Sequence, residues 1–124
     1  DTTKWLHMTF NISGQKGFDF EVFEDAVTND DGDELTANNN NRNSIKTSDA
    51  VIRADDTIVD TGTRLEGFSS GTSPNPNAIS GGATSREDEL VLRQNTKYLF
   101  RITSNVAGNT MSFCGSWYEH INNN

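Results

Sequence analysis

Residues 87–120 read EDELVLRQNTKYLFRITSNVAGNTMSFCGSWYEH and carry the strongest hydrophobic alternation in the chain. Apolar side chains recur at every second position in residues 98–102 and 111–117, and polar turn residues separate these two runs. A period of two predicts half-buried β-strands. We expect two or three adjacent strands here that form the spine of the fold, with these inward side chains in the core: Tyr98, Phe100, Ile102, Phe113 and Trp117.

The N-terminal part of the chain predicts two more strands. Residues 6–12 and 18–23 alternate apolar and polar side chains, and a turn with two glycines, residues 13–17, joins them. This arrangement predicts a β-hairpin, with His7 on its outer face. Weaker strand patterns follow at three places: residues 45–47, 51–53 and 57–68.

These patterns predict a single all-β domain over residues 1–124. About seven or eight strands with one buried face each are typical of an antiparallel β-sandwich, and we expect it to be jelly-roll-like. Only 32% of the residues are hydrophobic, which fits a thin core with long polar loops. Residues 69–85 are predicted to form a long surface loop, and residues 121–124 a flexible tail.

The net charge is −8, from 18 acidic and 10 basic residues. An acidic surface repels phosphate backbones and anionic lipid headgroups, so we expect neither nucleic acid nor a membrane as a partner. No apolar run reaches membrane-spanning length. The charge also favours solubility, which suits a protein displayed at high local density.

The sequence lacks a pattern for nucleophilic catalysis. It has two histidines and one cysteine, Cys114, which alternates with small polar residues and is predicted to be structural. There is no nucleophile-elbow motif. Carboxylates at residues 87–89 and at Glu119 are candidates for glycoside chemistry, but chance proximity is expected among 18 acidic residues. We therefore predict no enzyme, no catalytic residue and no cofactor.

An acidic turn at residues 30–34 is the one candidate metal site. Calcium prefers several oxygen ligands at defined spacing. If Gly32 takes the invariant glycine position of an EF-hand loop, Val27 falls where a carboxylate is required. We therefore predict a solvated turn here and no metal, with a calcium loop of another kind as the alternative.

Several short motifs occur in an order that resembles small virion structural proteins of tailed bacteriophages. Together they span nearly the whole chain. The motifs are FEVFED (20–25), NNNRNS (39–44), DTGTRL (60–65), ELVL (89–92), NTKYLFRIT (95–103) and WYEH (117–120).

The resemblance is to capsid decoration proteins, also called cement proteins. It implies a non-enzymatic β-sandwich, made in the host bacterial cytoplasm, that binds the outer capsid surface in many copies. The implied partners are the major capsid protein and neighbouring copies of the chain itself. Polar loops and the final strand supply the candidate contact residues: Asn39, Asn41, Arg42, Asn43, Asn75, Asn77, Tyr118 and His120.

Three alternatives stay open at this stage. A tail or other appendage protein of the virion fits the same motifs. A carbohydrate-binding module would use an exposed aromatic platform that includes Trp5, Trp117 or Tyr118, although the alternation predicts that Trp117 belongs to the core. The third alternative is a domain of a secreted adhesin.

Overall fold

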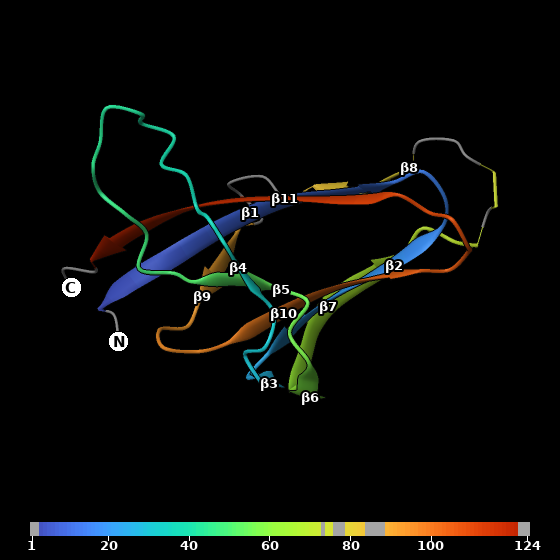
Figure 1. Cartoon of the computed structure of the whole chain (residues 1–124), viewed down its shortest axis with the longest axis horizontal. Coiled ribbons are helices and arrows are strands. Elements are labelled where there is room, and N and C mark those ends of the chain that lie inside the picture. Colours follow the sequence, from blue (N-terminus) through green and yellow to red (C-terminus); the bar gives the residue numbers. More distant parts are fainter. Residues whose placement is uncertain (1–2, 73, 76–78, 84–88, 122–124) are drawn as a thin grey trace.

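Two antiparallel sheets face each other as the layers of a sandwich (Figure 1). The computed structural model describes residues 3–72, 74–75, 79–83 and 89–121. The first sheet contains β1 (Lys4–Gly14), β8 (Ile79–Ala83), β9 (Leu90–Leu92) and β11 (Met111–Ile121). The second contains β2 (Phe18–Glu24), β7 (Thr63–Ser69) and β10 (Tyr98–Ser104). Two short pairs complete the fold: β3 (Val27–Thr28) with β6 (Ile58–Asp60), and β4 (Asp33–Leu35) with β5 (Ile52–Ala54).

The core lies between β1 and β2, the central strands of the two sheets. β1 pairs with β11 on one side and with β8 and β9 on the other, whereas β2 lies between β10 and β7. A central strand is screened from water by both neighbours, so its inward side chains become fully buried. The core cluster accordingly consists of residues from these two strands alone: Phe10, Ile12, Phe18, Phe20 and Val22.

The all-β sandwich prediction is confirmed, and the described residues form an antiparallel fold without helices. The weaker strand patterns at residues 51–53 and 57–68 correspond to β5, β6 and β7. A jelly-roll connectivity stays a prediction.

The predicted hairpin of residues 6–12 and 18–23 is wrong. β1 and β2 belong to different sheets and face each other across the core instead of sharing hydrogen bonds. Alternation shows which face of a strand is buried, but a hairpin and a connection between facing sheets give the same alternation. Residues 15–17 therefore cross from one sheet to the other (Figure 1).

The predicted spine in residues 87–120 is also wrong in part. Its strands are not adjacent, because β10 belongs to the second sheet and β11 to the first. Phe100 and Ile102 pack against the core cluster but stay partly exposed. Phe113 contacts the Phe10 and Phe100 rings, yet it remains 40% exposed. Both strands lie at sheet edges among the described residues, which explains their incomplete burial.

Three local predictions are corrected as well. Residues 45–47 form no strand, because Ile45 points into solvent and the Lys46 backbone joins local turns. The predicted loop at 69–85 contains β8, which pairs through its backbone with the end of β1 and needs no apolar pattern to do so. Ile121, placed in the predicted tail, is the last residue of β11 and pairs with Lys4. Residues 122–124 lie outside the described residues.

The connection from β1 to β2 depends on a close backbone approach at Gly17. A Cβ atom at this position would lie 2.2 Å from the carbonyl oxygen of Gly71. We expect Gly17→Ala to lower the free energy of unfolding by about 1–3 kcal/mol, because the two segments must separate to admit the methyl group. Chemical denaturation measures this change. Gln15→Ala, an exposed position in the same connection, is the control and should change stability by less than about 0.5 kcal/mol. An equal stability of the two variants would contradict the close approach.

Candidate functional site

A long segment between β4 and β5 projects beyond the sandwich (Figure 1). We call residues 36–51 the arm. It has no strand of its own, and it contains the asparagine-rich sequence from which four of the candidate contact residues were predicted. Its end nearer β5 lies against β11, close to the point where β1 begins and β11 ends.

The Glu119 carboxylate on β11 holds the base of the arm. It accepts hydrogen bonds from the Ser48 hydroxyl and from the backbone nitrogen of Asp49, the latter at 3.1 Å. The Trp117 indole nitrogen lies 3.2 Å from the same carboxylate. Lys4 adds ion pairs of 2.9 Å to Asp49 and 3.7 Å to Glu119. Charged hydrogen bonds of this kind are the stronger ones in proteins, so the base of the arm is firmly attached.

Asparagine and serine side chains give the arm its internal shape. The Asn39 side-chain oxygen accepts a 2.9 Å hydrogen bond from the Asn41 backbone, and the Asn39 amide donates to the Lys46 carbonyl at 3.1 Å. The Ser44 backbone nitrogen donates to the Asn41 carbonyl at 2.9 Å. These are the local turns that Asn and Ser favour. The hydrogen bond between the Asn39 amide and the Lys46 carbonyl joins the two sides of the arm, so the arm is a structured loop.

The tip of the arm presents an apolar side chain to solvent. Ile45 is 98% exposed, and its neighbours Arg42 and Lys46 are exposed too. Covering an exposed isoleucine with a partner's apolar surface lowers the free energy of the complex. The tip therefore has the composition of a contact point, with one apolar anchor beside two cations.

A second group of candidate side chains lies on and beside the outer face of β1 and β11. The His7 ring stacks on the Tyr118 ring with centroids 4.6 Å apart, and its Nε2 lies 2.8 Å from Nε2 of His120. On its other side, His7 Nδ1 is 2.6 Å from a carboxylate oxygen of Glu89, and the Tyr118 hydroxyl donates to the same oxygen at 3.1 Å. Trp5 lies beside His120, with ring centroids 6.3 Å apart. We call these five residues the outer-face cluster.

The arm and the outer-face cluster border a common open depression. Its volume is about 390 Å³. Aromatic rings and polar side chains line it together: His7, Thr9, Asn40, Glu89, Ser116, Trp117 and Tyr118. Asn40 of the arm and His7, Glu89 and Tyr118 of the outer-face cluster therefore share one surface.

The predicted contact residues fall into three places. Asn39, Asn41, Arg42 and Asn43 are exposed on the arm, and Tyr118 and His120 are exposed on β11. Asn75 is exposed in the connection between β7 and β8, apart in sequence from both groups. Asn77 lies outside the described residues.

Several members of the site were not predicted from the sequence. The sequence pattern predicts a strand at Ile45, and nothing in the asparagine run distinguishes Asn40 from its neighbours. His7 was correctly placed on an outer face, but its contact with His120 depends on the pairing of β1 with β11. Glu119 was considered only as a catalytic carboxylate. Its backbone partners in the arm are 69 and 70 residues away, and no local signal indicates such a contact.

The acidic turn at residues 30–34 is held by contacts within the chain. Asp31 accepts a 2.6 Å hydrogen bond from the Thr57 backbone, and Asp30 forms a 2.6 Å ion pair with Lys97. The hydrogen bond from Lys97 is the largest cause that lowers the pKa of Asp30. Among the residues that the structure describes, no group of three or more His, Cys, Asp or Glu side chains is arranged to hold a metal ion.

Comparisons with known proteins identify no relative of this chain. No family model, no curated protein and no solved structure matches this chain. Within the described part of the chain there is also no helix with the length and apolar character needed to cross a membrane.

The anchor of the arm is expected to depend on pH. Burial acts to raise the pKa of Glu119, but hydrogen bonds from Ser48, Asp49, Ala50 and Trp117 outweigh it and hold the pKa below the ordinary value of 4.5. A carboxylate with a lowered pKa in the folded state stabilises the protein above its unfolded-state pKa. This stability is lost as the pH falls through the folded-state value.

We expect Glu119→Gln to lower the free energy of unfolding by about 1–3 kcal/mol at pH 7, because several partly buried donors lose a charged acceptor. The difference from the unmodified protein should shrink as the pH falls below 4.5, because the Glu119 carboxyl group of the unfolded chain then begins to protonate before that of the folded protein. Urea denaturation across this pH range measures both effects. Glu66→Gln removes an exposed carboxylate on β7 and serves as the control. A difference that stays constant down to pH 2 would contradict the anchoring role of the charge.

Proposed function

We propose that this chain is a non-enzymatic structural protein of a tailed-bacteriophage virion. It binds the outside of the capsid shell in many copies and stabilises the lattice of the major capsid protein. The observation that carries the proposal is the arm: a structured loop, anchored by Glu119, that holds a 98% exposed Ile45 away from the sandwich. The resemblance of the sequence motifs, in their order, to virion proteins of tailed bacteriophages supports this class of particle.

A projecting anchor suits a protein that clamps a repeating surface. Binding of each copy is favourable only where a partner covers its apolar tip. A partner site that is formed by the assembled shell is absent from the free capsid subunits. A protein that binds only the assembled state stabilises that state. Repeated weak contacts, with the shell and between neighbouring copies, then add up over the lattice.

The surface charge suits display in many copies. A net charge of −8 keeps identical domains apart in solution and maintains their solubility at high local concentration. We therefore propose that the protein is made in the host bacterial cytoplasm and then binds to the outer capsid surface. A tail or appendage location would use the same features.

The second candidate function is binding of host glycans. The observation that favours it is the exposure of two aromatic rings on one face, Trp5 at 38% and Tyr118 at 42%. Tyr118 borders the depression, where Asn40 and Ser116 offer hydrogen-bonding groups. A flat ring beside such groups is a suitable surface for a sugar.

The proposal predicts that the protein is a constant component of intact particles. Mass spectrometry of density-purified virions should find it at a fixed ratio to the major capsid protein, and virions that lack it should lose DNA at a lower temperature. Its absence from purified virions would contradict the proposal. Binding to immobilised glycans that is lost in Tyr118→Ala, without any association with particles, would support the second candidate instead.

A further inference from the structure

We infer that the arm tip docks on an acidic protein surface with an apolar socket, and that the acidic body of the domain faces away from that surface. This inference rests on the proposed function and assigns the chemistry of the contact on the shell. It reverses the simpler expectation that a chain of net charge −8 binds a basic patch.

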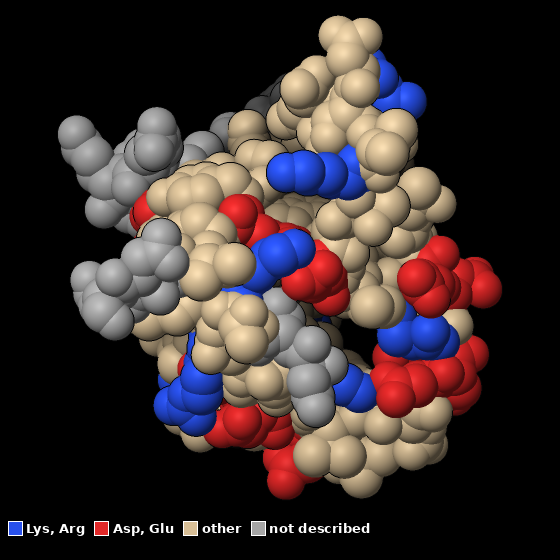
Figure 2. Space-filling view, turned by 90° about the vertical axis from the view of Figure 1, so that its left-hand side faces the viewer, with Lys and Arg blue, Asp and Glu red and all other residues tan. Residues whose placement is uncertain are grey.

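The arm tip is a cationic region on an acidic protein. From residue 36 to residue 48 the sequence contains Arg42 and Lys46 but no Asp or Glu. The first carboxylate after this stretch, Asp49, forms a 2.9 Å ion pair with Lys4 at the base of the arm. In Figure 2 the projecting upper part of the molecule is tan and blue, and the red carboxylates lie below it.

Arg42 and Lys46 form no ion pair with any described residue. Most other described cations do pair with carboxylates, as Arg53 does with Asp56 at 3.1 Å and Arg101 with Glu21 at 2.9 Å. The domain has an excess of acidic side chains, yet none of those described lies within ion-pair distance of the tip. These two positive charges are therefore available to a partner.

The position of Ile45 between the two cations determines what the partner must offer. Ile45 is 98% exposed, follows Arg42 by three positions and directly precedes Lys46, so a partner that covers Ile45 also meets the exposed segment that carries both cations. Bringing a cation into an interface costs free energy unless an opposite charge meets it. The partner therefore needs an apolar socket for Ile45 and carboxylates around it. A nucleic-acid backbone supplies the negative charge but no socket.

The internal hydrogen bonds of the arm favour such a contact. The Asn39 amide links the two sides of the arm at the Lys46 carbonyl, and the Arg42 guanidinium donates to the Asn39 carbonyl at 3.5 Å. These exposed contacts restrict the conformations of the tip before it meets a partner, which reduces the entropy lost on binding. Repulsion between an acidic shell surface and the body would keep the body outward, so contact is confined to the tip.

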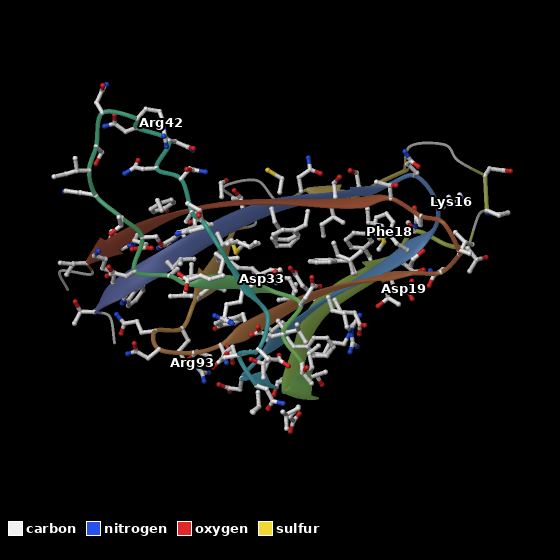
Figure 3. The ribbon with its side chains drawn as sticks, viewed as in Figure 1. Lys16, Phe18, Asp19, Asp33, Arg42 and Arg93 are labelled. Carbon is white, nitrogen blue, oxygen red and sulfur yellow. The ribbon has the colours of Figure 1, made fainter. Side chains whose placement is uncertain are left out.

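The test is co-sedimentation of the purified chain with capsid shells that lack it. The variant Arg42→Glu/Lys46→Glu reverses both tip charges, and Ile45→Ala removes the apolar anchor. The single variant Lys46→Glu is tested beside the double reversal, and Lys16→Glu is its matched control: the change is the same, but Lys16 lies at the opposite end of the sandwich from the arm (Figure 3). All altered positions except Lys16 are exposed, and thermal unfolding confirms that each variant is folded.

We expect the double reversal to weaken binding to shells about tenfold or more, and Ile45→Ala to weaken it several-fold. Lys16→Glu should remain within about twofold of the unmodified chain, and higher salt should weaken binding of the unmodified chain. Binding of the double variant at full or greater strength would overturn the inference while the proposed function stands. A failure of the unmodified chain to bind shells would overturn both. Binding to duplex DNA that depends on Arg42 and Lys46 would overturn the acidic-protein assignment.

Discussion

Packing between the two central strands is the interaction on which the rest of the structure depends. Phe10 of β1 and Phe20 of β2 meet across the sandwich with ring centroids 5.3 Å apart, and Ile12, Phe18 and Val22 complete the same cluster. Every other strand of the two main sheets pairs with β1 or β2. These side chains therefore position both sheets, and through β11 they also position the base of the arm and the outer-face cluster.

The sequence was sufficient to predict the fold class but not the strand partners. Alternation correctly separated inward residues such as Phe10 from outward ones such as His7. It did not show that β2 crosses to the facing sheet, because either arrangement buries the same side chains. It also did not separate central strands from edge strands. Phe113 and Phe20 look equivalent in a pattern, yet one is 40% exposed and the other 1%.

The candidate site was also predictable from the sequence only in part. The asparagine-rich segment was recognisable as a loop from its composition, and it became the arm. What composition did not reveal is the attachment of the arm, which depends on Glu119 and on contacts between residues about 70 positions apart. The outer-face cluster is equally non-local, since His7 and His120 are separated by 113 residues. Their meeting follows from the register of β1 with β11, which side-chain alternation leaves undetermined.

The structure therefore has a core formed by two central strands, and the candidate contact surfaces lie at its periphery. Native-state hydrogen exchange, read for each amide, tests this picture most directly, because it orders the parts of a protein by their opening free energy. The structure predicts that the slowest amides lie in β1 and β2, around Ile12 and Phe20, and that the tip of the arm is among the fastest. A result in which amides of β10 and β11 outlast those of β1 and β2 would contradict the account.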